Sequence, residues 1–161
     1  MNYRFDGRSK EQFEKDILDR TLEERRLFLL WIQLLEKKNG QKIKYKNTGC
    51  DNSGEYLEDQ DVSTVADFEV EGYGRVEVKF SKPVLDKFFH LKSSQVKKYI
   101  NQNATILMIN GTSSDKPVYT MLDAKCLTKI SEECKEIPWA GFGRKMSYKI
   151  PINMFIWRPL T

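Results

Sequence analysis

The stretch ADFEVEGYGRVEVKF, residues 66 to 80, decides the fold. Apolar and polar residues alternate on both sides of its central Gly-Tyr-Gly, which is typical of two half-buried strands joined by a glycine-containing turn. The even positions are the apolar ones: Phe68, Val70, Val76, Val78 and Phe80. The stretch therefore predicts a β-hairpin with one buried face and one polar face.

The register of this hairpin determines which polar side chains meet. A three-residue loop with Gly74 in the left-handed conformation pairs 71 with 75, 69 with 77 and 67 with 79. Asp67, Glu77 and Lys79 then share one face, whereas a two-residue loop would place Asp67 on the opposite face. The sequence leaves the choice between these loops open, and the predicted site depends on the three-residue loop.

The remaining chain predicts an α/β fold. A helix from Ser9 to Asn39 begins with a capping box (Ser9 with Gln12) and stops at Gly40, and its part from Leu27 to Leu35 should be buried. The other expected elements are a strand at 42–46, a polar loop at 47–60, a loop after Pro83, a helix at 94–101, strands at 105–109 and 118–122, and a closing edge strand at 150–156 containing Pro151. This order predicts one domain spanning residues 1–161, with a central mixed β-sheet flanked by helices.

Composition excludes several classes of site. The chain has 161 residues, of which 40% are hydrophobic and 31% charged, an ordinary globular balance. It has three cysteines without C-x-x-C spacing and one histidine, His90, so a disulfide framework, a cysteine zinc site and a histidine metal site are not expected. Neither G-x-S-x-G nor a phosphate-binding glycine loop is present. An enzyme with this sequence would work with carboxylates, lysines and a metal.

Charge is distributed unevenly along the chain. The longest apolar run is Leu27 to Ile32, far short of a membrane span, and the polar start does not resemble a secretory signal, so we expect a soluble cytoplasmic protein. The net charge is +4, with lysine-rich stretches at 37–46 and 79–98 around an acidic stretch at 51–61. This arrangement suits a polyanion that meets a cation-binding site, although an ordinary solvated surface is an equal alternative.

The polar face of the hairpin carries the parts of a metal-dependent phosphodiesterase. Without histidine, hydrolysis of a phosphodiester needs a divalent metal, and Mg²⁺ prefers carboxylate oxygens. Asp67 and Glu77 would hold the metal, the Val78 carbonyl could add a ligand, and Lys79 could orient the attacking water. The tripeptide Glu-x-Lys occurs three times in the chain, so an acidic, merely solvated hairpin face explains the same pattern.

Here the chain resembles the PD-(D/E)XK nuclease superfamily. Ala66-Asp67 stands where the family has Pro-Asp, and Glu77-Val78-Lys79 stands for its (D/E)-x-K. The following Gln95-Val96-Lys97-Lys98-Tyr99 is a Q-x-x-x-Y motif, as in the branch that includes phage lambda exonuclease. The order of elements over roughly residues 10 to 110 also agrees. The resemblance implies a restriction-endonuclease-like sandwich.

The resemblance also implies the activity and the site. We expect Mg²⁺- or Mn²⁺-dependent cleavage of DNA, with Asp67, Glu77, Lys79 and Gln95 at the centre of the catalytic site. Asp67 and Glu77 would be metal ligands, Lys79 would lie near the nucleophile, and Gln95 and Tyr99 would be supporting site residues. A family glutamate on the first helix corresponds to Glu23 or Glu24, and both remain open. Expected nucleic-acid contacts are Lys97, Lys98, Tyr99, Arg144 and Lys145.

Several alternatives remain at this point. The chain could be a junction-resolving or other structure-selective enzyme, which could act as a homodimer, and it fits an exonuclease equally well. An RNA-directed nuclease would use the same site. The small size is similar to that of phage or mobile-element enzymes, which would act in the host cytoplasm on phage DNA. A different class is a non-catalytic module on the same fold that binds nucleic acid or protein.

Overall fold

Helix α1, Lys10–Asn39, begins and ends where the sequence predicts. The structure, a computed structural model, describes residues 9–48 and 66–161. The Ser9 side chain accepts a hydrogen bond from the Gln12 amide, and Gly40 closes the helix in the left-handed conformation at φ 69°. The buried residues of α1 lie mainly in its second half, from Leu27 to Leu35, as expected.

A six-stranded mixed sheet lies beneath α1. Its strands are β1 (Tyr45–Asn47), β2 (Phe68–Val70), β3 (Gly74–Ser81), β5 (Thr105–Asn110), β6 (Val118–Leu122) and β9 (Arg158–Pro159). Their spatial order is β1-β2-β3-β5-β6-β9, and only the β3–β5 pair is parallel. The predicted strands at 105–109 and 118–122 are confirmed, and the one at 42–46 lies slightly later, at 45–47. Most of the polar loop expected at 47–60 falls outside the described residues.

The hairpin forms, but its predicted register is wrong by two residues. Phe68 pairs with Val76 and Val70 pairs with Gly74, so the loop is 71–73 rather than 72–74. The cause is Gly72, which also adopts a positive φ of 80° and completes a turn in which the Tyr73 amide donates to the Val70 carbonyl. Because side chains alternate with period two, a shift of two residues leaves every side chain on its predicted face.

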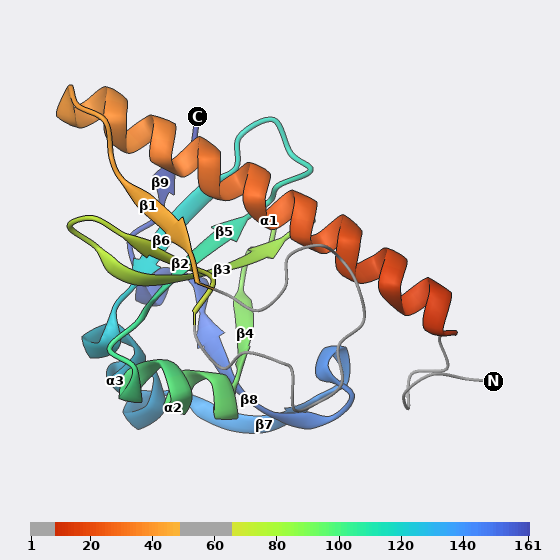
Figure 1. Ribbon diagram of the computed structural model, residues 1–161. Helices are drawn as coiled ribbons and strands as arrows, with labels where there is room; N and C mark the ends of the chain where they lie inside the picture. Colours follow the sequence, from red (N-terminus) through yellow and green to blue (C-terminus); the bar gives the residue numbers. More distant parts are fainter. Residues whose placement is uncertain (1–8, 49–65) are drawn as a thin grey trace.

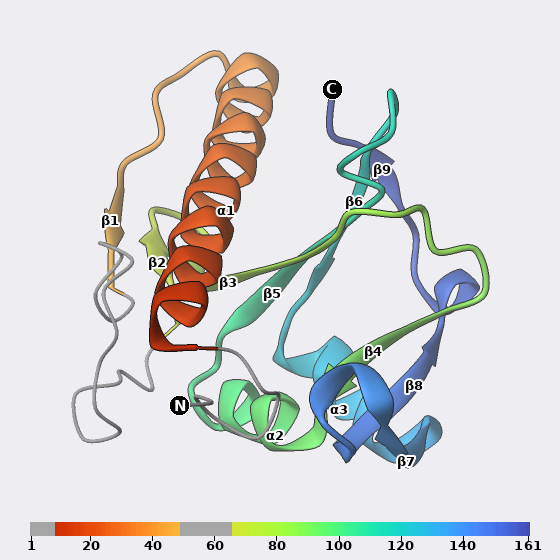
Figure 2. The ribbon, with the colours of Figure 1, turned by 90° about the vertical axis from the view of Figure 1, so that its right-hand side faces the viewer.

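Helices lie on both faces of this sheet (Figures 1 and 2), and each face carries a hydrophobic core. On one face α1 packs through Phe28, whose ring stacks on Phe68 at 3.7 Å, and through the buried Trp31. On the other face lie α2 (Ser93–Asn101) and α3 (Ala124–Glu133), which contribute buried Val96 and Leu127 to the second core. The helix expected at 94–101 is thus confirmed, and the α/β class with helices on both faces of a mixed sheet is observed.

A second, three-stranded antiparallel sheet was not predicted. It consists of β4 (Phe88–Lys92), β8 (Lys145–Pro151) and β7 (Lys135–Trp139), in that spatial order. Residues 88–92 were expected within a loop, which is wrong, and α3 was missed although Asp123 caps it by accepting from the Cys126 amide. One face of this sheet completes the second core beside α2 and α3.

The closing strand predicted at 150–156 is also wrong. The strand is β8, which ends at Pro151, and a 3-10 helix follows at Ile152–Met154. Pro151 fixes this boundary because it supplies the extended residue from which the 3-10 turn begins. β8 is the central strand of its sheet rather than an edge strand. The predicted alternation of apolar residues at even positions extends toward the N-terminus, since Tyr148 and Ile150 are both buried. Among the described residues, no helix is apolar over a length that could cross a membrane.

Candidate active site

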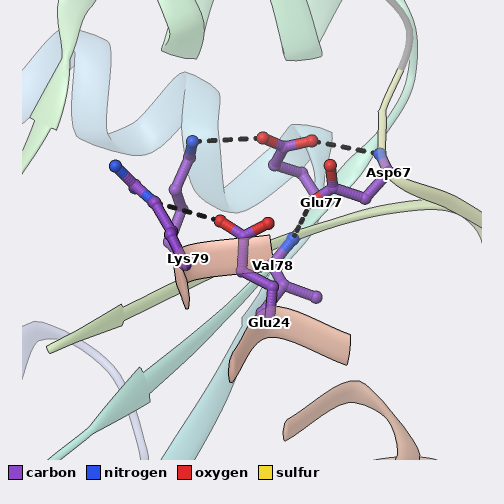
Figure 3. Close-up of polar contacts among 6 residues, drawn as sticks. Glu24, Asp67, Glu77, Val78 and Lys79 are labelled. Carbon is purple, nitrogen blue, oxygen red and sulfur yellow. Dashed lines mark hydrogen bonds and ion pairs between the residues drawn. The ribbon is translucent and has the colours of Figure 1, made fainter. Parts of the chain in front are cut away.

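The hairpin brings two acidic side chains together. One residue beyond the Phe68–Val76 pair, Asp67 lies opposite Glu77. The Asp67 amide donates a hydrogen bond of 3.1 Å to Oε2 of Glu77 (Figure 3). This bond forms because β2 begins only at Phe68, so the Asp67 amide has no partner in the ladder and donates to a side chain instead.

At the same strand end the buried Val78 has no residue of β2 opposite it. Its amide donates to Oδ2 of Asp67 at 3.1 Å rather than to a neighbouring strand (Figure 3). In an extended strand the amide and the carbonyl of one residue point to the same edge, so the Val78 carbonyl also faces the Asp67 side. The carbonyl predicted as a metal ligand therefore lies on the correct edge of β3.

Lys79 is the cation of this group. Its Nζ atom lies 3.1 Å from Oε1 of Glu77, and the two side chains are only 15% and 9% exposed. An ion pair with so little exposure is screened weakly by water and salt, unlike the surface pairs of the same sheet. Asp67, Glu77 and Lys79 thus share one face of the hairpin, as the alternating pattern predicts.

The structure distinguishes between the two glutamates of the first helix. Glu24 turns toward the hairpin, is 17% exposed, and is close enough to influence Asp67 electrostatically (Figure 3). Arg20, one turn earlier, holds it through Nε at 3.1 Å. Glu23 instead forms a bidentate pair with Arg26 on an exposed part of α1. Glu24 is therefore the third carboxylate beside Asp67 and Glu77; we call these three residues and Lys79 the carboxylate cluster.

Helix α2 closes the cluster with Tyr99. Tyr99 is only 2% exposed, and its hydroxyl hydrogen-bonds to the Glu77 side chain. Burial, followed by the negative charge of Glu77, raises the pKa of Tyr99, so the hydroxyl stays protonated and donates. Gln95 lies one helical turn earlier and is half-buried, which places it on the same side of α2 as Tyr99. Tyr99, which the sequence predicts as a supporting site residue and as a nucleic-acid contact, therefore lies in the site beside Glu77.

The carboxylate cluster carries more negative charge than its cations neutralise. Burial, and then the neighbouring Glu77 and Glu24, raise the pKa of Asp67 to about 8. Burial also raises the pKa of Glu24, against the opposing effects of Arg20 and Lys79. Carboxylates that resist ionisation because they are buried, and because they lie beside one another, are typical of sites that a divalent cation would stabilise.

The side chains of the carboxylate cluster are of the types that bind a hard divalent cation, but they are not arranged around one point. Within residues 9–48 and 66–161, no three acidic, histidine or cysteine side chains converge on one point. Asp67 accepts from Val78 and Glu77 accepts from Asp67 and Lys79, so their oxygens are engaged with the protein. Mg²⁺ needs only one or two protein carboxylates and keeps several waters, so Asp67 and Glu77, with the Val78 carbonyl, would be enough oxygen ligands.

The predicted nucleic-acid contacts lie in two places. On α2, Lys97 is exposed and the Nζ atom of Lys98 lies 4.9 Å from the centre of the Tyr99 ring. Arg144 and Lys145 are exposed at the turn from β7 to β8, where Arg144 adopts a positive φ of 63°. The first pair borders the carboxylate cluster, and the second belongs to the three-stranded sheet.

Comparison of the chain with protein-family models, with curated proteins and with solved structures finds no match in any of the three.

The hydrogen bond from Tyr99 to Glu77 leads to a first prediction. Tyr99→Phe keeps the buried ring but removes a donor to a carboxylate, and we expect it to lower the free energy of unfolding by about 1 to 2 kcal/mol. Urea denaturation measures this loss. The control is Tyr148→Phe, which changes an equally buried ring of the same core outside the carboxylate cluster and should cost less. Equal losses in both variants would contradict a specific role of the Tyr99 hydroxyl.

Proposed function

We propose that this protein is a metal-dependent deoxyribonuclease on a restriction-endonuclease-like sandwich. The observation that carries the proposal is the convergence of Asp67, Glu77 and Lys79 on one strand end, joined by Glu24 from α1. The order of helix, hairpin, helix and strand around it supports the resemblance found in the sequence. A phosphodiester is the substrate that this combination of clustered acids and one buried lysine suits best.

Asp67, Glu77 and Lys79 would have different roles in cleavage. Asp67, Glu77 and the Val78 carbonyl would hold Mg²⁺ or Mn²⁺, which supplies Lewis acidity toward a phosphate oxygen. Lys79 stands within reach of the same place, where its Nζ can orient the attacking water and offset the charge that develops on the phosphate.

The neighbours of these residues would act as supports. Tyr99 holds Glu77 in place and keeps its own proton, while Gln95 on the same helix side could hydrogen-bond to the attacking water or a phosphate oxygen. The exposed Lys97, Arg144 and Lys145, together with the half-buried Lys98, would contact phosphates of the DNA strand. These contacts position the strand and carry no sequence information.

The substrate would be a particular DNA structure rather than a particular sequence. A junction, a flap or an end arising in phage DNA recombination or repair fits a small enzyme that recognises backbone geometry. The competing function is a non-catalytic module that binds nucleic acid or protein, and the engaged carboxylate oxygens of Asp67 and Glu77 favour it.

Cleavage assays on a panel of DNA structures separate these functions. Linear, nicked, flapped and four-way-junction DNA would each be incubated with Mg²⁺, with Mn²⁺ and with chelator. Cleavage only with a metal supports the nuclease, and the preferred substrate identifies its branch. Failure of both metals on every substrate, with DNA binding intact in chelator, would instead support the binding module.

A further inference from the structure

The three-stranded sheet has a second face, away from the core, that the carboxylate cluster does not use. Along β4 and β8 the side chains that point to the core are buried, as in Phe89, Leu91 and Ile150. The register of the three strands puts the alternate positions together on the opposite side. We call that side the outer face, and its principal residues are Phe88, His90, Lys92, Lys135, Trp139, Lys145 and Lys149.

Aromatic rings follow one another along the outer face. Trp139 of β7 stacks on His90 of β4 with ring centres 3.7 Å apart and planes 5° apart, so the two rings lie across the central strand β8. Phe88 lies two residues before His90, and Phe142 in the β7–β8 turn flanks the other end. Because alternate strand residues are about 7 Å apart, the rings form a row rather than a cluster.

Gly141 allows this position of Trp139. A Cβ atom on Gly141 would lie 2.5 Å from Nε1 of Trp139, so any other residue would displace the indole. Trp139 nevertheless remains 37% exposed, and Phe88 is 38% exposed. The turn therefore presents a large, fixed ring to the outside, which a residue needed only for packing would not require.

Lysine side chains lie beside the aromatic rings of the outer face. The Nζ atom of Lys149 lies 4.2 Å from the centre of the Phe88 ring, and that of Lys92 lies 5.3 Å from the Phe142 ring. Lys135 and Lys145 are exposed on the same face. None of the outward positions of β4, β7 and β8 carries an acid, because Glu136 pairs with Tyr148 on the inward side.

The surroundings of the outer face agree with this positive character. Burial, and then the charge of Lys149, lower the pKa of His90, so the stacked imidazole is neutral at pH 7. The nearby acid Glu133 pairs with Lys129 at 3.9 Å. It borders a hollow of about 340 Å³ beside Phe88, Lys135 and Lys149.

We propose that the outer face binds single-stranded DNA, with bases stacked on Trp139 and Phe88 and phosphates held by the surrounding lysines. Rings for stacking and lysines for the backbone are what sequence-independent binding of a single strand requires. Duplex DNA would not offer these rings free bases to stack on. The choice of DNA as the occupant rests on the proposed function.

The outer face leads toward the carboxylate cluster. β4 passes into α2 without a break, since Lys92 is both the last residue of β4 and the N-cap of the helix. Tyr99, which contacts Glu77, follows seven residues later, roughly 10 Å along the helix axis. A strand bound along β4 would therefore arrive beside the carboxylate cluster, and the outer face would select DNA with a single-stranded arm, such as a flap.

Binding in chelator tests the outer face without any cleavage. A fluorescent oligothymidine of about 20 nucleotides would be titrated and followed by anisotropy. Lys135→Glu/Lys145→Glu should weaken binding by about tenfold or more and lower the slope of log affinity against log salt by about 1.4, the value for two phosphates. Lys37→Glu/Lys38→Glu, which makes the same charge change at the exposed end of α1, should change affinity less than twofold, within about 0.4 kcal/mol.

Trp139 provides a signal that charge alone would not affect. Binding of a base against its ring should quench tryptophan fluorescence, and Trp139→Phe should remove the quenching while keeping most of the affinity. Trp139→Ala should weaken binding by about tenfold, the cost of one lost stacking contact. Circular dichroism of each variant verifies folding.

Three results would overturn the proposal. They are unchanged oligothymidine affinity in Lys135→Glu/Lys145→Glu, an equal affinity for blunt duplex DNA that competes for the same face, or a stable dimer of the free protein that covers Trp139. Because this titration contains no metal, it is independent of catalysis. A protein that binds oligothymidine here but cleaves no DNA in the separate assays with Mg²⁺ and Mn²⁺ would refute the nuclease and leave this inference standing.

Discussion

Lys79→Met is expected to lower metal-dependent DNA cleavage by at least about 100-fold, the usual contribution of a residue that positions or protonates a reacting group. Lys79 lies 3.1 Å from Glu77 and is largely buried, so its ammonium group is held at the site. Methionine keeps the length of the stem and removes only the charge. Initial rates under saturating Mn²⁺, with the substrate that the panel identifies, measure the loss.

Metal binding separates the chemical role of Lys79 from a role in assembling the site. Because Lys79→Met removes the cation that competes for Glu77, Mn²⁺ affinity measured by calorimetry should stay equal or rise. The matched control is Lys46→Met, since Lys46 also pairs with a glutamate, Glu69, at 3.4 Å but is 69% exposed. Lys46→Met should retain full cleavage activity. Cleavage by Lys79→Met at the wild-type rate would refute the proposed site.

The second large effect concerns Asp67→Asn. In the folded protein the pKa of Asp67 is raised to about 8, against an ordinary value of 3.8. The unfolded chain therefore loses this proton first, and the free energy of unfolding falls as pH rises from about 4 to about 8. Asparagine can still accept from the Val78 amide and carries no charge. We expect it to stabilise the metal-free protein at pH 8 to 9 by on the order of 2 kcal/mol, or roughly 4 to 8 °C in melting temperature.

The same substitution should have the opposite effect once a divalent cation is added. Mn²⁺ should raise the melting temperature of the wild type and have little effect on Asp67→Asn, because the cation needs the ionised carboxylate. In the wild type, Mn²⁺ affinity should increase with pH up to about 8 as the proton leaves Asp67.

Two control measurements test whether the effect of Asp67→Asn comes from the raised pKa of Asp67. At pH 4 the variant and the wild type should unfold at similar temperatures, since Asp67 is then protonated in the folded state. Glu69→Gln, which neutralises an exposed acid on the same hairpin, should change stability by less than about 0.5 kcal/mol at any pH. If Asp67→Asn melts below the wild type at pH 8 in chelator, the carboxylate cluster does not store excess negative charge.

Regular periodicity made the central part of the fold predictable. α1, the hairpin, α2, β5 and β6 all follow from caps or from an uninterrupted apolar pattern, and they place Asp67, Glu77 and Lys79. Strands β4 and β7 carry no such pattern, because Phe88 is exposed and because most of β7 is exposed at the edge of its sheet. Their position depends on pairing with β8, more than 50 residues after β4, which no local pattern records.

The sequence by itself determined which face of the hairpin Asp67, Glu77 and Lys79 occupy, since period-two alternation survives even a register error of two residues. Only the tertiary structure decided between Glu23 and Glu24, which neighbour each other on one turn and differ only in how α1 docks on the sheet. It also brought the Tyr99 hydroxyl to Glu77 and stacked His90 on Trp139 across β8. Alternation is a property of one strand, whereas these contacts join segments whose meeting depends on the packing of the whole chain.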